Sequence, residues 1–213
     1  MSKWQYLLLF IGRLPPAEKI LALLRFFILD VDTIDNNLSS SGIIYDVGCS
    51  TGLLTYYLAR KTNRSLIGID INAKRIEWAR QPLAGLSRNI QFVSGDVFDV
   101  TFPKISGAVL SDFLHHTAFD RQQELLKNLY KTLFSDKTII IKEIDNDEFV
   151  RKWLSRFWDF ILYPKDRIYY RSRQEWKELL TSIGFSVSVR SAVRWFPAST
   201  TLFICKKNND KKK

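Results

Sequence analysis

The sequence predicts an α/β domain with a doubly wound, mostly parallel, seven-stranded sheet and helices on both faces. Three observations support this fold class. Short apolar runs alternate with helical patterns over residues 41–145, and such alternation is typical of parallel sheets with crossover helices. One run, residues 43–47, leads through a glycine turn into an amphipathic stretch. The chain has 213 residues, 46% of them hydrophobic, which suffices for one sizeable core.

The first 40 residues predict a helical extension. Residues 3–12 favour a short helix, which Pro15 and Pro16 interrupt. Pro16 suits the first turn of the next helix, residues 17–29, whose apolar positions repeat at helical spacing. Residues 32–42 are polar and predict a loop.

The core over residues 41–145 is expected to bind a ligand at the carboxyl ends of its strands. Asn72 and the region 117–120 are candidate helix N-caps. Strands are predicted near 43–47, 65–70, 89–94, 105–111 and 137–144, and helices near 51–61, 72–80 and 119–134.

A helical insertion, residues 146–171, follows the fifth strand, with a helix expected over 147–162. The next unit, residues 172–206, begins with a helix to residue 183, because Ser172 and Glu175 have the spacing of a capping box. Residues 185–190 and 199–206 predict two further strands. Residues 207–213 form a basic tail that we expect to be disordered.

Four of the predicted strands end at or beside an acid: Asp46, Asp70, Asp96 and Asp112. The turn after the first strand reads Asp46-x-Gly48-x-Ser50-x-Gly52. Glycines there let the backbone approach a ligand closely. The spacing is neither the G-x-G-x-x-G of dinucleotide-binding folds nor a phosphate-binding P-loop, because Leu53 follows the last glycine.

This pattern resembles motif I of the class I (Rossmann-like) S-adenosylmethionine (SAM) methyltransferases, of the type that acts on small molecules or lipids, with Ser50 at the middle glycine. We expect the turn to accept this serine if its φ is negative. The runs 66–70, 90–97 and 108–113 resemble the family's next three motifs in order. The resemblance implies SAM as cofactor, S-adenosylhomocysteine as product, and a final hairpin whose last strand is antiparallel.

The resemblance also implies a role for each motif residue. Asp46, Gly48, Ser50 and Gly52 would cradle the methionine part, Asp70 would hold the ribose, and Asp96 with Val97 the adenine. Asp112 and Phe113 would form the wall of the methyl-transfer site, and Cys49, Ile71 and Ser111 are also expected to bind the cofactor.

Two adjacent histidines, His115 and His116, follow the fourth strand. Histidine has a pKa suited to removing a proton from an acceptor hydroxyl, and His116 is the better candidate because the family often has a histidine at its position. In the alternative interpretation, both hydrogen-bond locally and order the loop. Glu143, at the end of the fifth strand, is a weaker candidate, which we expect to be solvated. No Cys/His cluster has metal-ligand spacing, so no metal is expected.

The insertion combines basic residues with a wide Trp/Phe face, and residues 4–13 have a similar character. Such segments are typical of helices lying on an anionic membrane surface. They favour a small apolar or lipid-linked acceptor, methylated at oxygen. The alternative is that these helices simply pack as a lid.

The net charge of +10 predicts an anionic partner. A nucleic acid is disfavoured, because Ser111-Asp112-Phe113-Leu114 lacks the Pro-Pro-aromatic motif of base-methylating enzymes. Cys49 and Cys205 predict buried thiols in a reducing compartment. No stretch is long and apolar enough to span a membrane, so the prediction is a cytoplasmic protein that contacts the inner membrane face. An inactive SAM-fold scaffold and an RNA methyltransferase stay as alternatives, and the oligomeric state is open.

Overall fold

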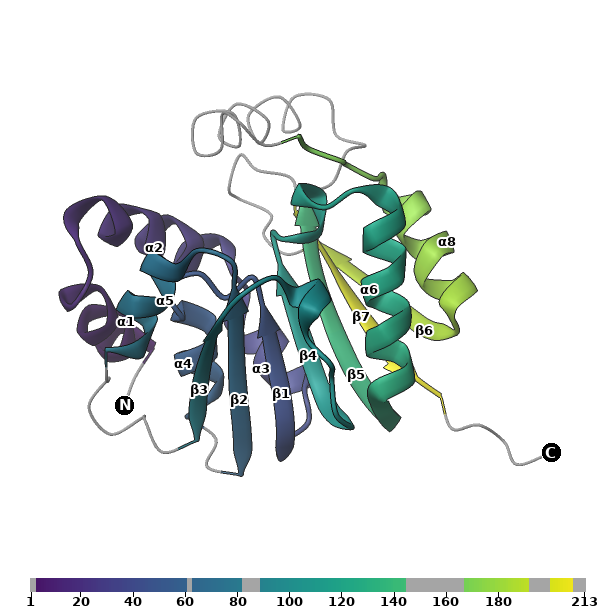
Figure 1. Ribbon diagram of the computed structural model, residues 1–213, viewed down its shortest axis with the longest axis horizontal. Helices are drawn as coiled ribbons and strands as arrows, with labels where there is room; N and C mark the ends of the chain where they lie inside the picture. The colour runs from purple at the N-terminus through teal and green to yellow at the C-terminus, as the bar shows by residue number, and fades with distance from the viewer. Residues whose placement is uncertain (1–2, 61–62, 82–88, 145–166, 192–199, 209–213) are drawn as a thin grey trace.

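The computed structural model describes residues 3–60, 63–81, 89–144, 167–191 and 200–208 (Figure 1). Their strands form one sheet of seven, in the order β3-β2-β1-β4-β5-β7-β6. The strands are β1 (Gly42–Val47), β2 (Arg64–Asp70), β3 (Ile90–Ser94), β4 (Ile105–Ser111), β5 (Leu133–Ile144), β6 (Phe185–Ser191) and β7 (Thr200–Lys207).

The first five strands are parallel to one another, and β7 is antiparallel to both β5 and β6. The predicted fold class and the antiparallel last strand are therefore confirmed. Because β1 lies between β2 and β4, the chain leaves the middle of the sheet in both directions. The carboxyl ends of β1 to β4 then meet at one edge, where a crevice is expected.

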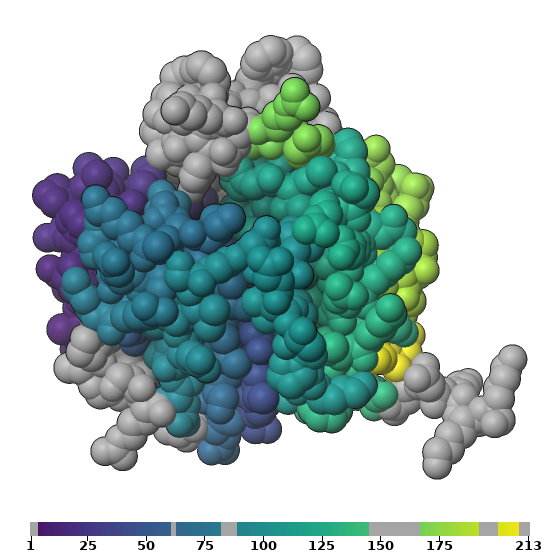
Figure 2. Space-filling view, viewed as in Figure 1, coloured from purple at the N-terminus to yellow at the C-terminus, as the bar shows by residue number. Residues whose placement is uncertain are grey.

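Alternate residues of each strand face opposite sides of the sheet. In β1, Ile44 packs into the core under helices α1 to α5, whereas Tyr45 packs into the core under α6 and α8. Figures 1 and 2 show the N-terminal helices on one flank of the molecule and α6 and α8 on the other. The helices are α1 (Lys3–Gly12), α2 (Pro16–Ile28), α3 (Val31–Asn37), α4 (Leu53–Leu58), α5 (Ala73–Arg80), α6 (Phe119–Thr132) and α8 (Arg173–Ile183).

Helix α3 corrects the expectation of a loop over residues 32–42. The Asp30 side chain caps it by accepting a hydrogen bond from the Thr33 N–H at 3.1 Å. Val31 and Ile34 are completely buried. The buried Arg64 guanidinium pairs with the Asp35 carboxylate. The helix is therefore stabilised by two buried apolar side chains and by one ion pair with β2. It is too short to produce a recognisable pattern in the sequence.

The capping predictions have different outcomes. The Asn72 side chain accepts from the Arg75 N–H at 3.1 Å, and Ser172 forms the complete capping box with Glu175. In the region 117–120, the N-cap is Ala118, which has no capping side chain. The predicted helix over 147–162 lies outside the described residues, as does most of the basic tail.

Cys49 and Cys205 are buried free thiols, as predicted. Within the described ranges, no helix has the length and apolar character needed to cross a bilayer.

Candidate functional site

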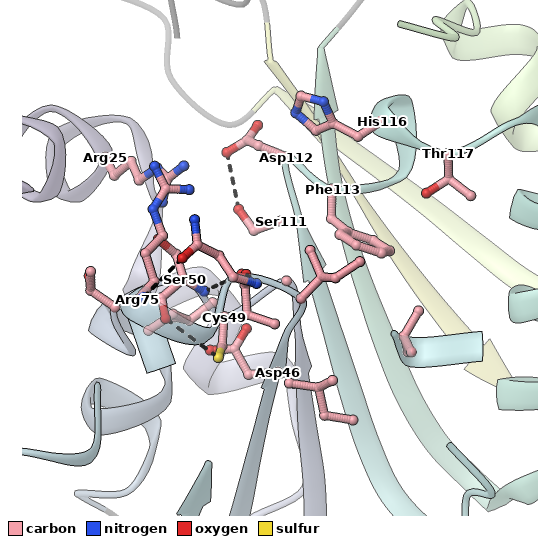
Figure 3. A pocket seen from close by; sticks show the side chains of 18 of the residues that line it. Arg25, Asp46, Cys49, Ser50, Arg75, Ser111, Asp112, Phe113, His116 and Thr117 are labelled. Carbon is pink, nitrogen blue, oxygen red and sulfur yellow. Dashed lines mark hydrogen bonds between the residues drawn. The ribbon is translucent and has the colours of Figure 1, made fainter. Parts of the chain in front are cut away.

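A cavity of about 760 Å³ opens at the carboxyl ends of β1 to β4 (Figure 3). It is bounded by α2, the turn after β1, the ends of β2 and β3, the loop after β4, the start of α6 and residues 167 and 169. Of the residues predicted from the sequence, Gly52, His115 and the weaker candidate Glu143 do not line it. Those that do are Asp46, Gly48, Cys49, Ser50, Asp70, Ile71, Asp96, Val97, Ser111, Asp112, Phe113 and His116.

The turn after β1 needs glycine at two positions. Gly48 has φ +73°, and a Cβ there would lie 2.6 Å from the Phe113 ring. Gly52 has φ +82°, and its Cβ would lie 2.8 Å from the Phe92 ring. The N–H groups of Gly48 and Cys49 both donate to the Ile69 carbonyl, at 2.8 and 3.0 Å. The turn is thus held tightly against β2, with its backbone exposed to the cavity.

Ser50 departs from the expectation of a negative φ, because its φ is +52°. Its N–H donates to the Asp70 carboxylate at 2.8 Å, which stabilises the left-handed conformation. The residue lines the cavity, and its Oγ is buried and has no hydrogen-bond partner among the described residues. A buried hydroxyl without a partner is costly, so this atom fits a polar ligand such as the methionine end of a sulfonium cofactor.

The strand-end acids help to hold the ends of the strands in place. The Asp46 carboxylate is buried and accepts from the Thr55 hydroxyl at 2.6 Å. Burial raises the pKa of Asp46 to about 6, although the Thr55 hydrogen bond opposes the rise. The other Oδ of Asp70 accepts from the Asn72 N–H at 2.8 Å. Asp96 accepts from the Phe98 N–H at 3.0 Å and starts the short 3₁₀ turn after β3.

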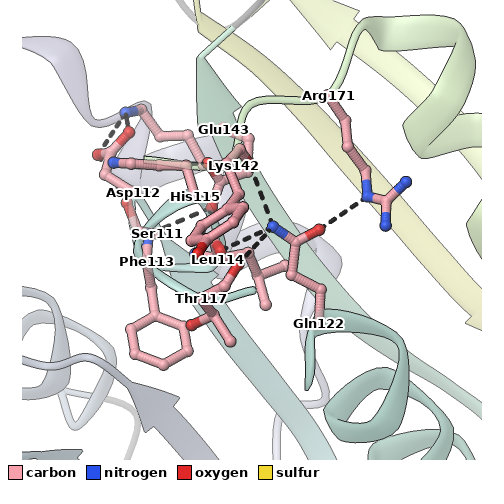
Figure 4. A network of polar contacts seen from close by, with 11 residues as sticks. Ser111, Asp112, Phe113, Leu114, His115, Thr117, Gln122, Lys142, Glu143 and Arg171 are labelled. Atoms are coloured by element: carbon pink, nitrogen blue, oxygen red, sulfur yellow. Dashed lines mark hydrogen bonds and ion pairs between the residues drawn. The ribbon is translucent and has the colours of Figure 1, made fainter. Parts of the chain in front are cut away.

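The loop after β4 carries a partly buried ion pair that the sequence did not reveal (Figure 4). Lys142 Nζ, fully buried, lies 2.7 and 2.6 Å from the two carboxylate oxygens of Asp112. Burial alone would raise the pKa of Asp112, but the Lys142 ammonium outweighs it and lowers this pKa. Asp112 has φ +51°, so the ion pair also stabilises an unfavourable backbone conformation.

Glu143 is not solvated, contrary to expectation, since only 1% of it is exposed. Its Oε1 accepts from the N–H groups of Phe113, at 3.2 Å, and Leu114, at 2.7 Å. Its Oε2 lies 2.5 Å from His115 Nδ1. The loop after β4 folds over the end of β5 and covers this carboxylate, which satisfies the loop's backbone donors.

The two histidines differ in position. His115 is buried against Glu143 and stacks on the Tyr170 ring, as in the alternative interpretation. His116 faces the cavity, with its ring centroid 4.3 Å from that of His115. Burial, followed by the His115 charge, lowers the pKa of His116 to about 3. His116 is therefore neutral at pH 7 and can accept a hydrogen bond from a ligand.

Gln122 of α6 joins this loop to the last residues of the insertion, 167–171. Its Nε2 donates to the carbonyls of Leu114, Thr117 and Tyr169, at 2.9 to 3.1 Å. The Tyr169 N–H in turn donates to the His115 carbonyl at 2.7 Å. The one sequence signal was a glutamine on the apolar face of a predicted helix. Within the described ranges, no group of three or more His, Cys, Asp or Glu could hold a metal ion.

Comparisons with known proteins agree with this geometry. A family model described as "Methyltransferase domain" matches residues 44–136. A carboxy-S-adenosyl-L-methionine synthase of Ruthia magnifica is 31% identical over 46% of this chain, and the match spans only 43% of that relative's length. One from Helicobacter pylori is 25% identical over 91% of this chain and 87% of the relative.

Among solved structures, magnesium protoporphyrin IX methyltransferase from Synechocystis with bound S-adenosylhomocysteine superposes with a TM-score of 0.64. It is 21% identical, and the superposition covers 83% of this chain and 82% of that one. At this identity the likeness establishes the fold.

Proposed function

We propose that this chain, which belongs to the class I SAM-dependent methyltransferase family, transfers a methyl group from its cofactor, SAM, to an oxygen of a small acceptor. SAM, when bound, supplies a methyl group on a sulfonium. In the proposed reaction, the acceptor hydroxyl would gain the methyl group and lose its proton to water, and S-adenosylhomocysteine would be left as the second product.

The observation that carries the proposal is the turn after β1. Gly48 and Ser50 of this turn, both with left-handed backbone, line the same cavity as Asp70, Asp96 and Asp112, and Ser50 Oγ is buried without a hydrogen-bond partner among the described residues. In our assignment, this turn and Ser50 hold the methionine part. Asp70 holds the ribose hydroxyls, and Asp96 with Val97 holds the adenine.

At the methyl-site end, Ser111, Asp112 and Phe113 form the wall and His116 contacts the acceptor. The low pKa of His116, caused first by burial and then by His115, makes it a weak proton acceptor. We therefore propose that it orients the acceptor hydroxyl by accepting its hydrogen bond, since alignment supplies much of the catalysis in such displacements. Accordingly, log(kcat/KM) should show no titration of His116 between pH 5 and 8, and His116→Ala should lower kcat about 10- to 100-fold.

We also propose that an apolar or lipid-linked acceptor reaches the cavity from a membrane surface on the inner, cytoplasmic side. Exposed apolar side chains on α2, which lines the cavity, and on α1, which packs against α2, support this proposal: Trp4, Leu8, Leu9, Ile20 and Phe27. The net charge of +10 favours an anionic bilayer. Sedimentation with anionic and with neutral vesicles tests it, and equal recovery in both supernatants would contradict it.

The names of the relatives support a second candidate function, the formation of carboxy-SAM. It would need a co-substrate that donates a carboxyl group. Mass spectrometry after turnover separates the candidates, because one leaves S-adenosylhomocysteine and the other a carboxylated cofactor.

The proposal is tested by incubating the protein with labelled SAM and cell extracts and identifying the labelled product. Calorimetry with SAM tests the site itself. Asp70→Ala should weaken SAM binding at least about tenfold, because a charge-assisted pair of hydrogen bonds is lost. Unchanged affinity would remove Asp70 from this role.

A further inference from the structure

Resting on the proposed methyl transfer, we infer that the acceptor carries an anionic group, a carboxylate or a phosphate, which Arg25 and Arg167 bind at the methyl-site end of the cavity. Both side chains line the cavity. They come from parts of the chain that are far apart in sequence, α2 and the last residues of the insertion, 167–171. Guanidinium groups bind carboxylate and phosphate oxygens through paired hydrogen bonds.

The acids of the cavity already have partners within the protein. Asp112 pairs with Lys142, Asp46 accepts from Thr55, and Glu18 lies 3.4 Å from Arg75. Asp70 and Asp96 accept from backbone N–H groups. Lys142 therefore offsets the charge of Asp112 and Arg75 that of Glu18, whereas Asp70 and Asp96 keep acceptor capacity for the cofactor. The guanidinium groups of Arg25 and Arg167 add positive charge to the lining of the same cavity.

Arg25 lies at the boundary between the cofactor and acceptor parts of the cavity. Figure 3 shows its side chain extending from α2, with Asp112 and His116 across the cavity. Its charge is close enough to influence the pKa of Asp46, Asp112 and His116, which lie on two different strand ends. An anion at Arg25 would thus sit beside the site of methyl transfer.

Arg167 belongs to a segment with a fixed backbone. Two residues later, the Tyr169 N–H donates to the His115 carbonyl at 2.7 Å, and its carbonyl accepts from Gln122 at 3.1 Å. The Tyr169 ring also lines the cavity. Arg167 and His116 line the same cavity. An acceptor held by its anionic group at the arginines would direct a hydroxyl to the neutral imidazole.

The same chemistry could come from a water-soluble metabolite or from a lipid headgroup. The experiment therefore has two arms: labelled SAM is incubated with the wild-type protein and either a water-soluble extract or a lipid extract. Labelled products are passed over an anion-exchange resin. Retained label in the first arm identifies a soluble anion, and in the second a lipid anion, and either result supports the inference.

With that acceptor, KM and kcat are measured for Arg25→Gln, Arg167→Gln and the control Arg190→Gln, an exposed residue of β6 far from the cavity. Loss of a charge-assisted contact should raise the acceptor KM about 10- to 100-fold. The affinity for SAM, measured by calorimetry, should stay within about twofold of wild type. Arg25→Lys should recover part of the loss, and thermal unfolding verifies that each variant is folded.

A labelled product that is neutral would overturn the inference while leaving the proposed function in place. So would an Arg25→Gln variant that binds SAM weakly but keeps the wild-type acceptor KM, because Arg25 would then serve the cofactor's own carboxylate. Absence of any labelled product in both arms would contradict the proposed function, and the inference would fall with it.

Discussion

At the cofactor end of the cavity, one short stretch, residues 46–52, supplies the turn, and each contact partner is a neighbouring strand end. At the methyl-site end, the loop 112–117 is held by residues from β5, α6 and the segment 167–171. The first end depends on local backbone conformation. The second depends on buried charges that are remote in sequence. Substitutions at the two ends should therefore differ in their effects on stability, kcat and SAM affinity.

The largest effect is expected for Glu143→Ala. Two backbone N–H groups and His115 would lose their acceptor in a buried position. Breaking such a buried pair costs about 3–5 kcal/mol, which urea unfolding would measure. The methyl-site loop would also shift, and kcat should fall about 100-fold. Glu143→Gln keeps the shape and one acceptor oxygen and should lose less. If Glu143→Ala has the wild-type kcat, then the methyl-site loop keeps its conformation without Glu143.

At the cofactor end, Gly48→Ala should distort the turn that is proposed to bind SAM. It leaves the buried charges of the methyl-site end, Lys142 and Glu143, unchanged. A left-handed alanine costs about 1–2 kcal/mol, and its Cβ would lie 2.6 Å from the Phe113 ring. We expect SAM affinity, measured by calorimetry, to fall more than about tenfold. Gly12→Ala is the matched control, because nothing lies within 4 Å of its Cβ. Equal affinities in the two variants would contradict this account.

Asp46→Asn sharpens the comparison through pH. Burial raises the pKa of Asp46 to about 6 in the folded protein, above its unfolded value. Its contribution to stability is therefore complete below the unfolded pKa and is lost as pH rises through about 6. The free energy of unfolding of Asp46→Asn should exceed that of wild type by about 1–3 kcal/mol at pH 8 and by little at pH 4. Urea unfolding at both pH values tests this prediction. If the difference in stability between variant and wild type does not change with pH, then ionisation of Asp46 is not its cause.

The smallest effect is expected at Ser50. Ser50→Gly relieves the left-handed strain and should stabilise the free protein by about 1 kcal/mol. It also removes the buried Oγ and should weaken SAM binding about 2- to 10-fold. Ser50→Ala should weaken binding similarly without the gain in stability. If neither variant changes the SAM affinity, then Ser50 Oγ does not contact the cofactor.

The strands and most helices followed from apolar periodicity and from caps such as Ser172 with Glu175. Helix α3 did not, because its stability comes from Arg64 and from two buried side chains rather than from its own pattern. Glu143 was misassigned for a related reason. A charged residue at a strand end is usually solvated, and only the folded loop covers it.

The sequence by itself determined the parallel core, the position of the glycine turn and the acids that line the cavity, because these depend on periodicity and on local backbone freedom. Tertiary structure alone decided the sign of φ at Ser50, which histidine faces the cavity, and the pairing of Lys142 and Glu143 with the loop after β4. These features depend on which remote groups share a buried volume, and burial sets both their charge and their partners.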